Sequence, residues 1–77
     1  MEYVINFTWD PEACVWIATS DDVPGLVLES GSFDALVERV HFAIPELLAL
    51  NGESNASNTP LNLIYRSERR DQVAVYG

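Results

Sequence analysis

The stretch SDDVPGLVLES, residues 20–30, contains two neighbouring acids, a Pro-Gly corner and an aliphatic run. Pro24 cannot donate a backbone hydrogen bond to a neighbouring strand, and Gly25 tolerates a positive φ, so we expect the chain to turn here. Residues 26–30, LVLES, are predicted to leave the corner as a strand. The corner therefore separates two strands before it from a strand and a helix after it.

The segment before the corner is predicted to be a β-hairpin. Residues 2–9, EYVINFTW, alternate so that the large side chains at 3, 5, 7 and 9 share one face of a strand. Residues 10–13, DPEA, carry Asp and Pro where a type I turn favours them, and residues 14–20, CVWIATS, return as the second strand. A four-residue loop predicts three opposed pairs: Trp9 with Cys14, Phe7 with Trp16, and Ile5 with Ala18.

The segment after the corner predicts one amphipathic helix that covers one face of the sheet. Ser32 is a suitable N-cap, and Asp34 lies in the first turn, where the helix dipole favours a carboxylate. Pro45 removes a backbone donor and predicts a kink, and Asn51 and Gly52 end the helix. The apolar side chains recur at three- and four-residue spacing: Phe33, Leu36, Val37, Val40, Ile44, Leu47 and Leu48.

The remaining residues predict a loop, a strand and a tail. Residues 51–60, NGESNASNTP, have the composition of a flexible loop, and residues 61–67, LNLIYRS, that of a fourth strand. In the short tail at 68–77, the segment QVAVY at 72–76 either adds a fifth strand or pairs with a neighbouring chain. The sequence thus predicts a single α+β domain over residues 1–77, with the order β-β-β-α-β and an antiparallel sheet of four or five strands.

The charge of the chain is strongly negative and uneven. The formal net charge is −8, with ten acids and one base in residues 1–53 (−9) and two acids and three bases in residues 61–77 (+1). An acidic surface repels phosphate backbones, so direct nucleic-acid binding is not expected, whereas docking of a basic protein is favoured. From the charge alone, maintenance of solubility is the favoured explanation.

The residues that would support catalysis or metal binding are few. Cys14 is the only cysteine and His41 the only histidine, so neither a zinc site nor a Cys-His nucleophile is predicted, and no cofactor is expected. Asp21 and Asp22 could approach a divalent metal, but adjacent side chains of an extended segment point in opposite directions. They are better interpreted as the rim of a turn that accepts local backbone hydrogen bonds. The chain is therefore predicted not to be an enzyme.

The cellular location is predicted from what the chain lacks. It has one cysteine, no basic leader sequence and no apolar run long enough to span a bilayer. These features predict a cytoplasmic protein without membrane contact.

Self-association is predicted from the uncovered parts of the fold. One helix covers one sheet face and leaves Val4, Val15 and Ile17 exposed on the other. The C-terminal strand has few of the charges that block edge pairing, and its arginines could meet the acidic body of a second chain. We therefore predict a homodimer whose interface includes four residues of this region: Ile64, Arg66, Val73 and Val75.

The order of elements resembles that of a known family. The strand VWIATS (15–20), the corner DVPGL (22–26) and the helix start SGSFDALVERV (30–40) are similar to the N-terminal domain of HicB-type antitoxins, above all to short stand-alone HicB-like domains of unassigned function. The similarity covers about residues 2–67. It implies a partial ribonuclease-H-like fold without nuclease activity, in a protein that binds and neutralises a small basic toxin that cleaves messenger RNA. The predicted contacts for that partner are acidic: Asp21, Asp22, Glu29 and Glu38.

Many members of that family carry a second, DNA-binding domain, and the ten residues after Ser67 are too few for one. Repression of an operator by direct binding is therefore not expected. Two alternative functions stay open. One is a stand-alone oligomeric scaffold with no toxin, and the other is a degenerate ribonuclease-H-like hydrolase that uses Asp21 or Asp22 with Mg²⁺.

Overall fold

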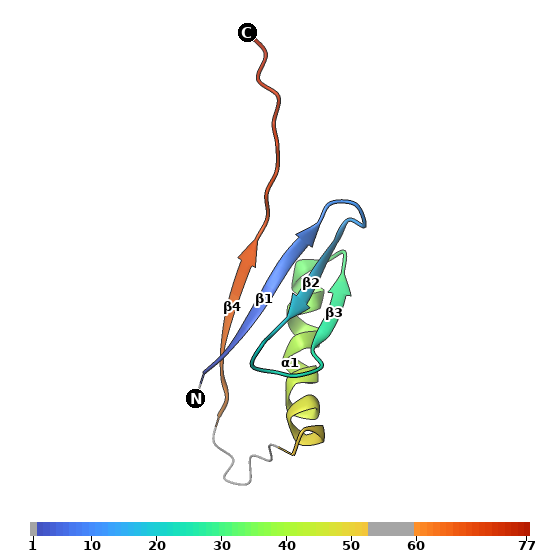
Figure 1. The fold of residues 1–77 in the computed structure, drawn as a ribbon. Helices are drawn as coiled ribbons and strands as arrows, with labels where there is room; N and C mark the ends of the chain where they lie inside the picture. Colours follow the sequence, from blue (N-terminus) through green and yellow to red (C-terminus); the bar gives the residue numbers. More distant parts are fainter. Residues whose placement is uncertain (1, 53–59) are drawn as a thin grey trace.

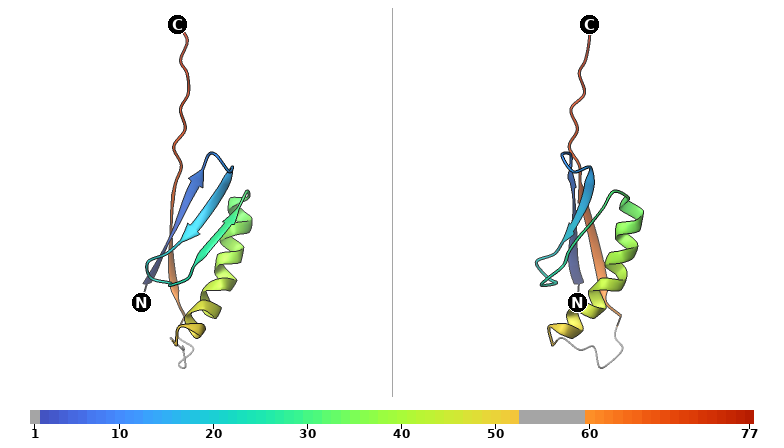
Figure 2. Two further views of the ribbon diagram at one scale, coloured as in Figure 1. Left: turned by 45° about the vertical axis from the view of Figure 1, so that its right-hand side comes forward. Right: turned by 90° about the vertical axis from the view of Figure 1, so that its right-hand side faces the viewer.

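A computed structural model of the chain describes residues 2–52 and 60–77 and shows an α+β fold, as predicted (Figure 1). The elements are β1 (Glu2–Asp10), β2 (Val15–Thr19), β3 (Val27–Ser30), α1 (Phe33–Leu50) and β4 (Asn62–Glu68). The four strands form one sheet in the order β3-β2-β1-β4, and α1 lies across one face of it (Figure 2).

The hairpin of β1 and β2 forms where predicted, but its register differs by two residues. The observed pairs include Trp9 with Trp16 and Phe7 with Ala18, so the predicted pairs of Trp9 with Cys14, Phe7 with Trp16 and Ile5 with Ala18 were wrong. The loop is Pro11–Cys14, because Cys14 adopts a φ of 55° and closes it one residue later than predicted. Asp10 stays in β1, and its Oδ1 accepts hydrogen bonds from two loop N–H groups. A shift of two residues keeps every side chain on its predicted face.

The sheet is mixed, which corrects the predicted antiparallel arrangement. β4 runs parallel to β1, with Val4 beside Ile64 and Asn6 beside Arg66. The hairpin and the corner each reverse the chain, so β3 runs in the same direction as β1. Because α1 returns the chain to the end of the sheet where β3 begins, β4 starts from that end too (Figure 1).

The Pro-Gly corner connects β2 to β3 and is anchored by two buried side chains. Gly25 has a φ of 88°, as predicted, and the N–H of Leu26 donates to the Val23 carbonyl at 3.2 Å. The side chains of Val23 and Leu26 are both buried. Asn51, just after α1, donates its Nδ2 to the Pro24 carbonyl at 3.2 Å and so attaches the corner to the end of the helix.

α1 begins and ends as the capping residues predict. Ser32 is the N-cap, and its hydroxyl accepts from the Ala35 N–H at 3.2 Å. Asn51 is the C-cap, and α1 continues through Pro45 as a single helix. Four buried side chains, Leu36, Val40, Ile44 and Leu48, face the sheet at four-residue spacing.

The core lies between α1 and the sheet. The strands contribute Tyr3, Ile5, Phe7 and Ala18, which are all buried. The ring of Phe33 lies 5.0 Å from the rings of both Phe7 and Trp16. Within the described residues, no helix is long and apolar enough to cross a membrane.

The last two predicted segments are the loop 51–60 and the fifth strand 72–76. Residues 53–59, most of the predicted loop 51–60, lie outside the described residues. Residues 69–77 leave the sheet in an extended conformation beyond β4 (Figure 1). The segment 72–76 therefore forms no fifth strand within one chain.

Candidate functional site

The face of the sheet opposite α1 carries no covering element in the part of the chain that the structure describes (Figure 2). We call it the open face. The strand registers place apolar side chains of all four strands on it: Val4, Val15, Ile17, Val27 and Ile64. None of these five packs against the core cluster, and Val27 is 70% exposed.

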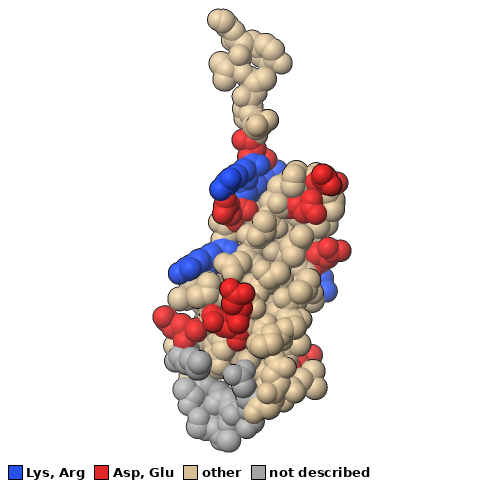
Figure 3. Space-filling view, in the orientation of Figure 1, with Lys and Arg blue, Asp and Glu red and all other residues tan. Residues whose placement is uncertain are grey.

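Charged side chains accompany this apolar centre. Glu29 on β3 is paired with Ile17, and Arg66 and Glu68 on β4 lie beside polar residues of β1. Figure 3 looks onto the open face and shows an uncharged strip along the sheet with charged side chains on both sides. The face thus combines an apolar centre with a charged margin.

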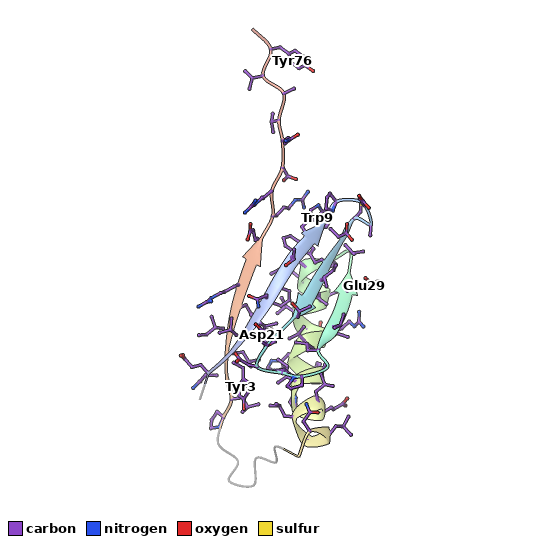
Figure 4. The ribbon with its side chains drawn as sticks, in the orientation of Figure 1. Tyr3, Trp9, Asp21, Glu29 and Tyr76 are labelled. Carbon is purple, nitrogen blue, oxygen red and sulfur yellow. The ribbon has the colours of Figure 1, made fainter. Side chains whose placement is uncertain are left out.

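The structure does not bring the four predicted partner contacts together. Asp21 and Asp22 lie in the connection after β2, and Glu29 lies on the open face at the β3 edge (Figure 4). Glu38 is exposed on α1, two residues from the buried Leu36 and Val40, and therefore points away from the sheet. Glu29 is the one predicted acid that a strand register places on the open face.

Asp22 has a structural role that the sequence did not reveal in detail. Its Oδ2 accepts from the Val4 N–H at 2.8 Å, while the Ser20 hydroxyl donates to the Val4 carbonyl at 2.6 Å. The Asp22 N–H in turn donates to Ser20 Oγ at 3.0 Å. Two side chains thereby satisfy the backbone of β1 at the point where β2 has ended. Asp22 accepts a backbone hydrogen bond, as predicted, but the donor is not a local group: it is the N–H of Val4, 18 residues earlier in the chain.

The predicted interface residues fall into two groups. Ile64 and Arg66 lie on the open face of β4, where Arg66 also lines a shallow depression between β1 and β4. Val73 and Val75 lie in the tail and are 83% and 92% exposed. These two groups do not meet within one chain.

The start of the tail is fixed by a contact that sequence reasoning missed. The guanidinium carbon of Arg69 lies 4.2 Å from the centre of a Trp9 ring, and its Nε donates to Asp71 at 3.1 Å. Arg70 pairs with Glu68 at 2.8 Å. A basic pair after an aromatic-rich hairpin is the only sequence signal for this arrangement.

The described residues offer little for metal chemistry. Within residues 2–52 and 60–77, no three His, Cys, Asp or Glu side chains form a group that could hold a metal ion. The thiol of Cys14 is exposed and donates to the Pro11 carbonyl at 3.6 Å.

The fold and this surface define a class of small α+β protein: one helix on one face of a four-stranded mixed sheet, with the other face open. A family model described as a domain of unknown function (DUF1902) matches residues 2–76, and the chain belongs to this family.

One solved structure is similar over nearly the whole chain. The crystal structure of the hypothetical protein TTHA1013, from the extremely thermophilic bacterium Thermus thermophilus, is 36% identical with a TM-score of 0.78. The match covers 95% of this chain and 100% of that one. A search of curated proteins found no match.

Proposed function

We propose that the protein is a non-enzymatic binding module whose open face docks a small basic protein. The observation that carries the proposal is the row of apolar side chains on adjacent strands, left uncovered in a chain of net charge −8. The resemblance to HicB-type antitoxins supplies the kind of partner: a small basic toxin that cleaves messenger RNA and is neutralised by direct binding.

Physical arguments support a protein partner. Protein interfaces combine a desolvated apolar centre with a polar, charged margin, which is the pattern of the open face. Apolar patches of this kind on a small domain mark interaction sites. The excess negative charge accelerates the approach of a basic partner and disfavours acidic ones, so association should weaken as salt rises.

The proposed contact uses fewer acids than the four predicted from the sequence. Ile17 and Glu29 are direct neighbours on the open face and form the centre and margin of the proposed contact. Asp21 is exposed beside this surface. Asp22 has a structural role, because its carboxylate accepts from the Val4 N–H. Glu38 points away from the proposed site.

The experiment compares two matched charge reversals. Tagged wild-type protein, Glu29→Lys and Glu38→Lys are used to retrieve partners from the native lysate, and any small basic protein is identified and purified. We expect the wild type and Glu38→Lys to retrieve it, Glu29→Lys to retrieve much less, and the released partner to cleave RNA until wild-type protein is added back.

Three results would contradict the proposal: retrieval of no basic protein, equal retrieval by the two variants, or a partner without RNA cleavage. The last result would leave a binding module and remove the toxin from the proposal.

A hydrolase is disfavoured by the position of the acids. The Asp22 carboxylate already accepts from the Val4 N–H, and Asp21 is exposed without a described group of acids around it. A catalytic divalent metal needs several oxygen ligands that converge. Calorimetric titration with millimolar Mg²⁺ should therefore give no binding heat, and saturable heat lost in Asp21→Asn would revive the hydrolase.

A further inference from the structure

Three of the large hydrophobic residues that are exposed in the described chain lie together in the C-terminal tail. Val73, Val75 and Tyr76 are 83%, 92% and 92% exposed on an extended segment that projects from the sheet (Figures 1 and 4). Because of this projection, the molecule measures 61 × 21 × 19 Å. Val73 and Val75 alternate with Gln72 and Ala74, a pattern typical of a strand with one buried face.

β4 offers an edge on which such a strand could be added. In the described chain β4 pairs only with β1, so its outer row of N–H and C=O groups has no strand beside it. α1 contacts β2 and β3 and leaves the helix side of β4 partly uncovered, where Tyr65 is 39% exposed.

The opposite edge of the sheet is protected. β3 is only four residues long, and the Glu29 carbonyl already accepts from the Arg39 guanidinium at 2.9 Å. Short edge strands with occupied backbone groups resist the addition of a further strand. The β4 edge is therefore the available one.

We propose that the tail of one copy adds as an antiparallel strand to the free edge of β4 in a second copy, and that the exchange is reciprocal. β4 and the tail form one continuous segment, so a two-fold axis near Arg69 brings each tail onto the β4 of the other copy. The two sheets then join into a closed dimer in which both tails are used.

The side chains of the two segments match in one register. In a continuous strand, Val73 and Val75 lie on the same side as Leu63 and Tyr65, because side chains alternate. With Arg69 on the axis, Val75 faces Leu63 of the second copy and Val73 faces Tyr65.

The same register places Arg70 opposite Glu68 of the second copy. Each chain already makes that ion pair within itself at 2.8 Å, at side chains that are 90% and 65% exposed. Exchanging a contact between identical chains in this way is a low-cost route to a dimer.

The tail is poorly suited to fold back onto its own β4. Such a hairpin would have to turn within Arg69-Arg70-Asp71, which contains no glycine, whereas tight hairpin turns favour Gly or Asn where the backbone needs a positive φ. Arg69 is also held in place by the Trp9 ring and by Asp71. The β4 of a second copy can pair with the tail without such a turn.

The first experiment compares two neighbouring substitutions of equal charge. Val75→Asp places a carboxylate against Leu63, whereas Ala74→Asp places it on the opposite side of the added strand. For the purified wild type, light scattering at micromolar concentration should give twice the 8.6 kDa chain mass. Dimer dissociation constants should rise roughly tenfold or more for Val75→Asp and much less for Ala74→Asp. Circular dichroism confirms that both variants fold.

The second experiment tests the register by cross-linking. In a Cys14→Ser background, a chain with Ile64→Cys is mixed with a chain with Ala74→Cys and oxidised. Opposed residues of an antiparallel pair lie within disulfide range, so the mixture should cross-link, whereas each variant alone should cross-link far less.

Three results would overturn the proposal: a strictly monomeric wild type at high concentration, equal effects of the two aspartates, or no cross-linking in the mixture. Both experiments use the purified chain alone, so they are independent of the basic partner proposed for the open face.

Discussion

At the scale of single residues, the side chains of Ser20 and Asp22 make the hydrogen bonds that the backbone of a neighbouring strand would otherwise make. If β2 continued in its register, residue 21 would face Val4. The chain leaves the sheet instead, and the two side chains on either side of Asp21 take over the hydrogen bonds to the Val4 backbone. The corner can therefore start without leaving the N–H and C=O of β1 unpaired.

Asp22→Ala should lower the free energy of unfolding by about 1 to 2 kcal/mol, because the Val4 N–H loses its acceptor. Asp22→Asn should cost less, since an amide oxygen can still accept. Asp21→Ala is the control and should change stability by less than about 0.5 kcal/mol. Urea denaturation measures all three, and equal effects of Asp21→Ala and Asp22→Ala would contradict the assignment.

Tyr65 gives the fold a dependence on alkaline pH. Desolvation by burial raises the pKa of its phenol above the ordinary value of 10.0. The unfolded chain therefore ionises first, and the stability present below that value is lost as pH rises through the raised pKa. Between roughly pH 9 and 11, Tyr65→Phe should lose less stability than the wild type in denaturation curves. Parallel pH profiles of the two proteins would show that Tyr65 has no such role.

At the scale of elements, α1 tolerates a proline that weakens it. Pro45 is exposed and lies inside the helix, where it cannot donate to the carbonyl one turn earlier. Pro45→Ala should raise the free energy of unfolding by about 1 to 3 kcal/mol. Glu46→Ala, also exposed, should leave it within about 0.5 kcal/mol. Thermal denaturation compares the two, and a less stable Pro45→Ala would mean that the proline ring makes a favourable contact.

The elements show which parts of the fold are encoded locally. Both ends of α1 were predicted, because Ser32 and Asn51 act through bonds to residues three or four positions away. The hairpin register was missed because Cys14 adopts a positive φ that favours glycine or asparagine, so its identity carries no signal. The parallel direction of β4 depends on where a whole helix returns the chain, and no short pattern encodes that.

The candidate site was less predictable than the fold. The apolar residues Val4 and Ile17 could be placed on the open face from strand alternation alone. The acids could not be sorted in the same way, since Glu29 and Glu38 look alike in sequence and lie on opposite sides of the molecule. Arg69 needed the three-dimensional position of Trp9 to acquire a role.

At the scale of the whole molecule, the proposed dimer predicts that stability depends on concentration. Folded copies that associate are stabilised by mass action. The Tm of the wild type should therefore rise with protein concentration, and that of Val75→Asp should rise less. Ala74→Asp should follow the wild type, and calorimetry over a range of concentrations measures all three. A concentration-independent wild-type Tm would contradict the dimer.

The position of β1 between β2 and β4 has a consequence for synthesis of the chain. β1 is made before the other three strands, yet one of its two neighbours, β4, is made only after β2, β3 and α1. Before β4 is made, the backbone N–H and C=O groups on one side of β1 have no partner strand. An unpaired strand edge of this kind recruits chaperones or neighbouring nascent chains. Once β4 has paired with β1, the unpaired edge of the sheet is that of β4.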